Sequence, residues 1–137
     1  MDKKNAITYT ETLKDLMGKK TYLLSKAQTL FEIGMIETAQ PIFLSAAAYE
    51  ERIAAILDTE GRDLEAAVHR ISSASCYEKA GHLSRAIGFY RAALSGPINN
   101  KTRLDVLQML DNCLEKFTQQ PISHLSFLPM AETAATL

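Results

Sequence analysis

Hydrophobic residues recur three or four positions apart along most of the chain, and runs of β-branched or aromatic residues long enough for a strand are missing. From Glu11 to Ile33 the apolar positions follow helical spacing, with Gly18 as a weak point that could divide the stretch into two helices. Gly34 ends this stretch, because glycine readily adopts the left-handed conformation found after a helix. The spacing therefore predicts helical structure up to residue 33.

The next two helices are separated by a polar turn at residues 58–61. The first runs from Met35 to about Leu57, and the second covers residues 64–80 with Asp63 as its cap. The first is expected to bury one stripe of side chains, namely Ala39, Phe43, Ala46, Ile53 and Leu57.

The strongest break in the chain is Gly96-Pro97. A fourth helix over residues 83–95 stops there, and Asn99 or Asn100 caps a fifth. The fifth helix is expected to bury Leu104, Leu107, Leu110, Leu114 and Phe117.

The pattern divides the chain into three parts. Residues 1–10 are polar and are expected to be flexible, residues 11–118 form one helical domain, and residues 119–137 form an irregular tail. The tail is too apolar for a simple linker, and its prolines break it too often for a long helix. Folding back onto the domain and capture by another chain are equal alternatives, with disorder as the third.

Composition agrees with a soluble, all-α domain. The 47% of hydrophobic residues suffices for a core in 137 residues, and the 6 glycines and 4 prolines allow few interruptions. A net charge of −1 gives no field that would attract nucleic acid or an anionic membrane, so neither is an expected partner. No apolar run approaches the roughly 20 residues of a membrane span, and no signal peptide is recognised, so a cytoplasmic location is expected.

A pattern of glycine, alanine, aromatic and alanine occurs twice, with each pair of equivalent residues 47 positions apart. The glycine permits a tight turn, the alanines let two helices approach closely, and the aromatic fills space on the same face. The two copies are Gly34, Ala39, Phe43 and Ala46, and Gly81, Ala86, Tyr90 and Ala93.

This pattern resembles the tetratricopeptide repeat. Ala74 and Tyr77 precede Gly81 where the family has a small and a large residue, and Ala27 and Leu30 precede the first glycine in the same way. The 47-residue offset exceeds the family's usual repeat of about 34, which indicates a long variant similar to the vesicle-fusion attachment proteins.

The resemblance implies antiparallel helical hairpins wound into a right-handed superhelix. The repeats would cover about 20–57 and 63–97, and a C-terminal capping helix would cover about 100–117.

The resemblance also implies a ligand surface, because in this family ligands lie along the concave face made by the first helix of each hairpin. A mixed apolar and polar surface of this kind suits a peptide or helix of a partner protein. Leu24, Phe31 and Ile71 could instead belong to the core. By register the surface comprises Thr21, Leu24, Gln28, Phe31, Glu32, Val68, Ile71, Ser75, Glu78 and Lys79.

Charge is distributed unevenly. Residues 27–65 carry a balance of −6, and residues 66–103 carry +5. Neighbouring helices of opposite sign could complement one another, or the faces could dock an oppositely charged partner or a second copy of the chain.

No catalytic residue, metal site or cofactor is expected. Glu65, His69 and Ser73 follow one another at helical spacing with Cys76 beyond, but a hydroxyl in mid-helix has no free N–H groups nearby to stabilise an oxyanion. Cys76 and Cys113 are expected to be buried thiols, with a disulfide as the alternative.

The expected function is a protein–protein interaction module, an adaptor or chaperone-like protein, that completes its binding by forming an oligomer or a larger assembly. A self-assembling structural domain is the alternative, and a small helical enzyme or ligand carrier is the third.

Overall fold

The computed structural model describes residues 2–120, with side chains from Thr12 onward, and this range contains five α-helices and no β-strand. The prediction of an all-α protein is confirmed. The helices are α1 (Asp2–Glu32), α2 (Ile36–Thr59), α3 (Asp63–Lys79), α4 (Leu83–Leu94) and α5 (Asn100–Thr118).

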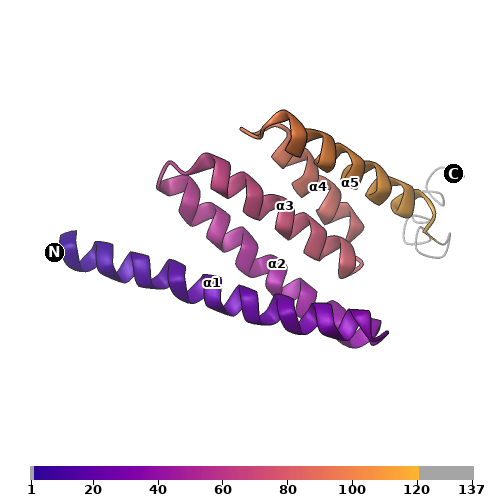
Figure 1. Cartoon of the computed structure of the whole chain (residues 1–137), viewed down its shortest axis with the longest axis horizontal. Coiled ribbons are helices and arrows are strands. Elements are labelled where there is room, and N and C mark those ends of the chain that lie inside the picture. The colour runs from indigo at the N-terminus through magenta and orange to yellow at the C-terminus, as the bar shows by residue number, and fades with distance from the viewer. Residues whose placement is uncertain (1, 121–137) are drawn as a thin grey trace, which may run out of the picture.

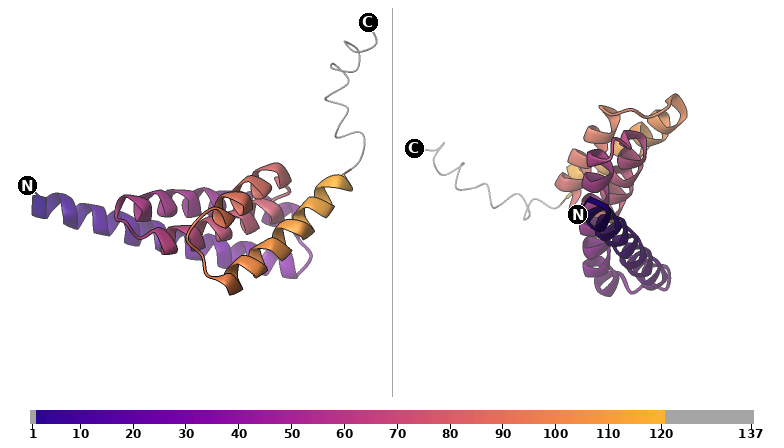
Figure 2. Two further views of the ribbon diagram at one scale, coloured as in Figure 1. Left: turned by 90° about the horizontal axis from the view of Figure 1, so that it is seen from above. Right: turned by 90° about the vertical axis from the view of Figure 1, so that its left-hand side faces the viewer.

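Each helix packs on the next helix in the chain, and successive helices run in opposite directions (Figure 1). The result is an open row in which α1 and α5 lie at opposite ends. The first turns of α1 project beyond the end of α2, as both views in Figures 1 and 2 show. This arrangement leaves α1 and α5 each with a face that no other described helix covers extensively.

The three connections between α1 and α4 share one geometry. Each contains a glycine with positive φ, 88° at Gly34, 74° at Gly61 and 86° at Gly81. In each turn the glycine N–H donates to the carbonyl three residues earlier, and the next N–H donates to the carbonyl five residues earlier. These hydrogen bonds satisfy carbonyls left free at the helix end. The sequence pattern paired Gly34 with Gly81, and Gly61 is a third copy of the same turn.

Two expectations about α1 are wrong. The helix begins at Asp2 rather than near Glu11, and it passes through Gly18 without a break. The expected flexibility of residues 1–10 stays a prediction. Once a helix is nucleated, each added residue gains a backbone hydrogen bond, so a polar segment can extend α1. A single glycine costs only about 1 kcal/mol relative to alanine, too little to divide a helix held by packing on both sides.

The two predicted caps differ in outcome. Asp63 is the first residue of α3, and no side chain caps that helix. Asn99 does cap α5, since its side chain accepts a hydrogen bond from the N–H of Thr102 at 2.8 Å. The prediction is confirmed for Asn99 because its extended backbone aims the side chain at the first turn.

The expected stripe of α2 is confirmed, and that of α5 is partly wrong. All five predicted side chains of α2 are buried. On α5, Leu104 and Leu107 are 68% and 46% exposed, and the buried residues are Val106, Leu110 and Cys113. Because α5 packs mainly on α4, only a narrow stripe is covered, and leucines outside that stripe remain in solvent.

The small residues of the repeated pattern are buried. Each predicted alanine is at most 1% exposed, and the equivalent aromatics Phe43 and Tyr90 are equally buried. Phe31 packs edge-on against Phe43 with ring centroids 5.8 Å apart. The buried alanines of the pattern are Ala27, Ala39, Ala46, Ala74, Ala86 and Ala93.

Candidate functional site

A groove of about 570 Å³ opens between α1, α3 and α5. Four residues of the predicted ligand surface line it, Phe31, Ser75, Glu78 and Lys79. The remaining lining residues are Tyr90 from α4 and Met109, Asn112, Glu115, Lys116 and Gln119 from α5.

The contribution of α5 was missed by the sequence reasoning, which took the fifth helix only as a cap. A signal was present, because Met109, Asn112, Lys116 and Gln119 follow one another at spacings of three and four residues. They therefore form one stripe of α5, and this stripe closes the groove.

Glu78 on α3 links the helices that surround the groove. Its side chain is only 12% exposed and accepts hydrogen bonds from the Tyr90 hydroxyl at 2.8 Å and from Lys116 Nζ at 2.5 Å. Burial and the neighbouring Glu78 carboxylate raise the pKa of Tyr90, so its hydroxyl stays a proton donor across the neutral range. The carboxylate thereby ties α3 to both α4 and α5.

Lys79 links α1 to α3 beside the groove. Its ammonium group donates to Gln28 Oε1 at 3.2 Å and lies 5.3 Å from the centre of the Phe43 ring. Gln28 in turn donates to Glu32 at 3.4 Å. The polar groups around the groove are thus positioned by contacts within the protein, and Phe31 and Met109 offer apolar surface between them.

The other predicted surface residues do not line the groove. Leu24 and Ile71 are partly buried against the core, as Phe31 also is, which agrees with the alternative interpretation of all three. Thr21, Glu32 and Val68 are exposed, Val68 to 50%. They share helical faces with the groove residues and extend the surface along α1 and α3.

A buried carboxylate on α2 was also missed. Glu50 is 1% exposed, and its side chain contacts His69 Nδ1 at 2.7 Å and Lys20 Nζ at 4.0 Å. Its position in the sequence carried the signal, because it lies between Ala46 and Ile53 in the apolar stripe of α2. An acidic residue in such a stripe needs a partner from a neighbouring helix.

The acid, base and nucleophile considered on α3 are engaged in packing. Glu65 pairs with Arg62 at 2.7 Å, while His69 faces Glu50 on α2. The fully buried Ser73 hydroxyl donates to the Ala47 carbonyl at 3.1 Å.

Burial raises the pKa of the Cys76 thiol to about 12, so it is not ionised near neutral pH. Both cysteines are free and buried, as expected. The side chains that could have formed a nucleophilic site are therefore held in other contacts.

Ion pairs join the acidic and basic parts of the chain. Asp58 on α2 pairs with Arg70 on α3, and Glu51 on α2 lies 3.3 Å from Arg85 on α4. Glu51 also accepts a hydrogen bond from the Tyr77 hydroxyl. Part of the uneven charge is therefore compensated between neighbouring helices.

Among the side chains that the structure describes, residues 12–120, no group of three or more His, Cys, Asp or Glu is placed to hold a metal ion. In the same part of the chain, no helix combines the length and apolar character needed to cross a membrane. Comparisons with models of known protein families, with curated proteins and with solved structures find no match for this chain.

Proposed function

We propose that the chain is a tetratricopeptide-like module that binds a peptide or helix of a partner protein in the groove between α1, α3 and α5. In this proposal α1–α2 and α3–α4 are antiparallel hairpins of a right-handed superhelix, and α5 is the capping helix. The matched burial of the two Gly–Ala–aromatic–Ala copies and their shared turn geometry support it.

The main support for the proposal is the lining of the groove. It combines apolar surface, which includes Phe31, with the charged pair of Glu78 and Lys116 and the Tyr90 hydroxyl that donates to Glu78. Side chains already fixed by internal hydrogen bonds lose little freedom when a ligand binds. The acidic and basic groups of the lining balance, so an amphipathic segment of mixed charge fits better than a single ion.

The test is to locate and then weaken the contact. A photo-crosslinking amino acid at position 109, inside the groove, should capture the partner in the native cell. The affinity of the purified partner is then measured by calorimetry for Met109→Glu and for Ala92→Glu, a control on the exposed face of α4. We expect about a tenfold or greater loss only for Met109→Glu. Equal affinities of the two variants would contradict binding in the groove, provided that both keep the wild-type melting temperature.

Self-assembly is a second candidate, favoured by the exposed leucines of α5. Leu104 and Leu107 are exposed on α5, the last helix of the row in Figure 1, where a further helix would continue it. Two copies stacked there would cover both leucines. Light scattering would then show a dimer that dissociates in the Leu104→Glu/Leu107→Glu variant, whereas a monomer at all concentrations rules this candidate out.

A further inference from the structure

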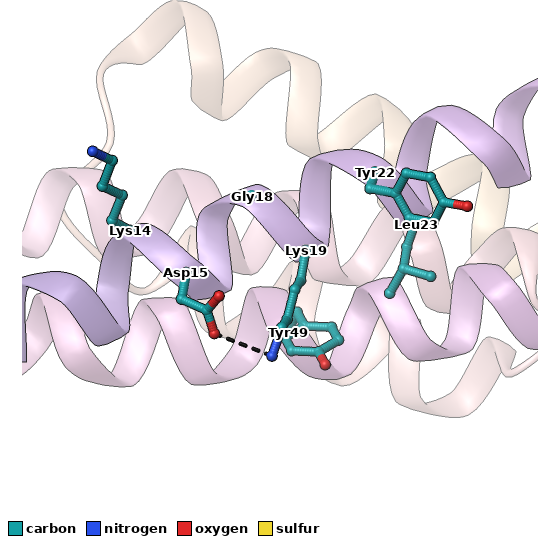
Figure 3. A pocket seen from close by; sticks show the side chains of 7 residues that line it. All are labelled: Lys14, Asp15, Gly18, Lys19, Tyr22, Leu23 and Tyr49. Atoms are coloured by element: carbon teal, nitrogen blue, oxygen red, sulfur yellow. Dashed lines mark ion pairs between the residues drawn. The ribbon is translucent and has the colours of Figure 1, made fainter.

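A second hollow, of about 660 Å³, lies between α1 and α2 and is larger than the groove. Figure 3 shows its lining residues, six of them on α1 and Tyr49 on α2. On α1 this surface includes Leu23, whereas the groove side of the same helix carries Gln28 and Phe31. Helical spacing puts these residues on different flanks of α1, so the two hollows are separate.

Gly18 is the residue of this hollow that the fold does not explain. It stands in the middle of α1 without a positive φ, and a Cβ atom there would meet nothing within 4 Å. A glycine in a helix costs about 1 kcal/mol relative to alanine. Gly88 on α4 has equally open surroundings, so the inference depends on the side chains around Gly18 as well.

Two tyrosines line the same hollow as Gly18. Tyr22 is 65% exposed, and the ring of Tyr49 reaches from α2 to the Lys19 side chain (Figure 3). A smaller hollow of about 300 Å³ continues beyond Tyr22 as far as Leu30. Together the two hollows follow α1 over residues 14–30, about 24 Å at the rise of an α-helix. Tyrosine is one of the residue types enriched among those that contribute most to binding at protein interfaces.

The charges around this surface are mainly positive. Lys14 and Lys19 line the larger hollow, Lys26 lines the smaller one, and the Arg52 guanidinium lies 5.6 Å from the Tyr49 ring centre. The one carboxylate in the lining, Asp15, is paired with Lys19 at 3.1 Å.

We propose that this surface binds an acidic amphipathic helix of a partner protein. An apolar side chain of that helix packs against Tyr22 and Tyr49 where Gly18 leaves space, and its carboxylates pair with the surrounding lysines. The length and straightness of the surface suit a helix lying along α1, and the missing side chain at Gly18 permits its close approach. This inference does not depend on what the groove binds.

The probe is a synthetic amphipathic helix of leucine, alanine and glutamate, compared with the same peptide carrying lysine in place of every glutamate. Binding to the ¹⁵N-labelled chain is followed by NMR. We expect the acidic peptide to shift the amide signals of Gly18, Tyr22 and Tyr49, with an affinity that falls as salt is added. Shifts confined to Ser75 and Met109 would assign the peptide to the groove and overturn the proposal.

Two glutamine substitutions provide the matched comparison. Gly18→Gln fills the hollow and should weaken the acidic peptide about tenfold or more. Gly88→Gln makes the same change at an equally open helical glycine and should leave the affinity unchanged. Both variants should melt at or above the wild-type temperature, because glutamine is the better helix former. Equal affinity of the two variants, stronger binding of the lysine peptide, or no binding of the acidic peptide at low salt would each reject the proposal.

Discussion

At the scale of single residues, Glu50 is the side chain whose environment constrains the fold most tightly. It is 1% exposed, and its partners come from the helices on either side, Lys20 on α1 and His69 on α3. A buried ion pair adds little net stability compared with a well-packed apolar group, but removing one member leaves the other buried and unpaired. The cluster therefore fixes which residues of α1, α2 and α3 face one another.

Replacing Glu50 should be costly. We expect Glu50→Ala to lower the free energy of unfolding by about 3 kcal/mol, because His69 loses its hydrogen-bond partner and a cavity is left between helices. Urea denaturation measures the change. Glu65→Ala is the control, since Glu65 is exposed and pairs with the exposed Arg62, and it should not change the denaturation midpoint measurably. Similar losses in the free energy of unfolding for the two variants would mean that the buried contact of Glu50 contributes no more than an exposed ion pair.

Because the pKa values of both buried thiols are raised, we expect the protein to lose stability at alkaline pH. Burial raises the pKa of Cys76 from its ordinary value of 9.0 to about 12 and that of Cys113 to about 11. The unfolded chain therefore ionises first, so the stability associated with neutral thiols is fully present below about pH 9 and is lost as the pH rises toward 12.

The melting temperature should fall as the pH is raised from about 9 to 12, and it should fall less steeply in the Cys76→Ala variant. At pH 8 neither thiol should react with a disulfide reagent until denaturant is added. Rapid reaction of the native protein would show that the thiols are accessible.

At the scale of the elements, the glycine turns decide where helices end. Gly81 has φ of 86°, and a Cβ atom there would come no closer than 3.5 Å to Gln40, an ordinary contact. The cost of Gly81→Ala is therefore the left-handed backbone itself, about 1–2 kcal/mol. Gly18→Ala, in the helical region with open space, should instead raise stability by about 1 kcal/mol. Thermal melts of the two single variants should move in opposite directions, and a shift of the same sign would contradict this account of the turns.

Glycine turns and the burial of helix faces also explain which elements could be predicted from the sequence. The ends of α2, α3 and α4 were predictable because each follows or precedes a turn that needs glycine. The buried stripe of α2 was predictable because helices cover it on both sides, which demands apolar residues. Leu104 and Leu107 misled because α5 is covered mainly on one side, so its apolar residues need not all be buried.

The candidate groove was predictable only in part for a related reason. Register from the two glycines located Phe31, Ser75, Glu78 and Lys79, which lie close to those turns. Side-chain packing against α4 determines which face of α5 points into the groove. No turn residue in the sequence indicates that rotation. The pairing of Glu50 with His69 was equally hidden, because helical periodicity describes one helix at a time.

At the scale of the whole molecule, extensive contacts join only consecutive helices of the described chain. The core is accordingly divided. A large cluster spans all five helices, and a smaller one joins Leu16, Ile53, Ala54, Leu57 and Ala66 near the α2–α3 turn. In a row of this kind, stability is a sum over neighbouring pairs, so one end can open while the other stays folded.

Substitutions at the two ends should therefore have local effects on hydrogen exchange. Val106→Ala removes a buried contact of α5 and should cost about 2 kcal/mol, with faster amide exchange concentrated in α4 and α5. Ile53→Val weakens the smaller cluster by about 1 kcal/mol and should accelerate exchange mainly in α1 and α2. Reciprocal patterns in the two variants would establish local opening, because a single cooperative unit must respond alike to both. Equal acceleration in all five helices would mean instead that the groove between α1, α3 and α5 cannot loosen without global unfolding.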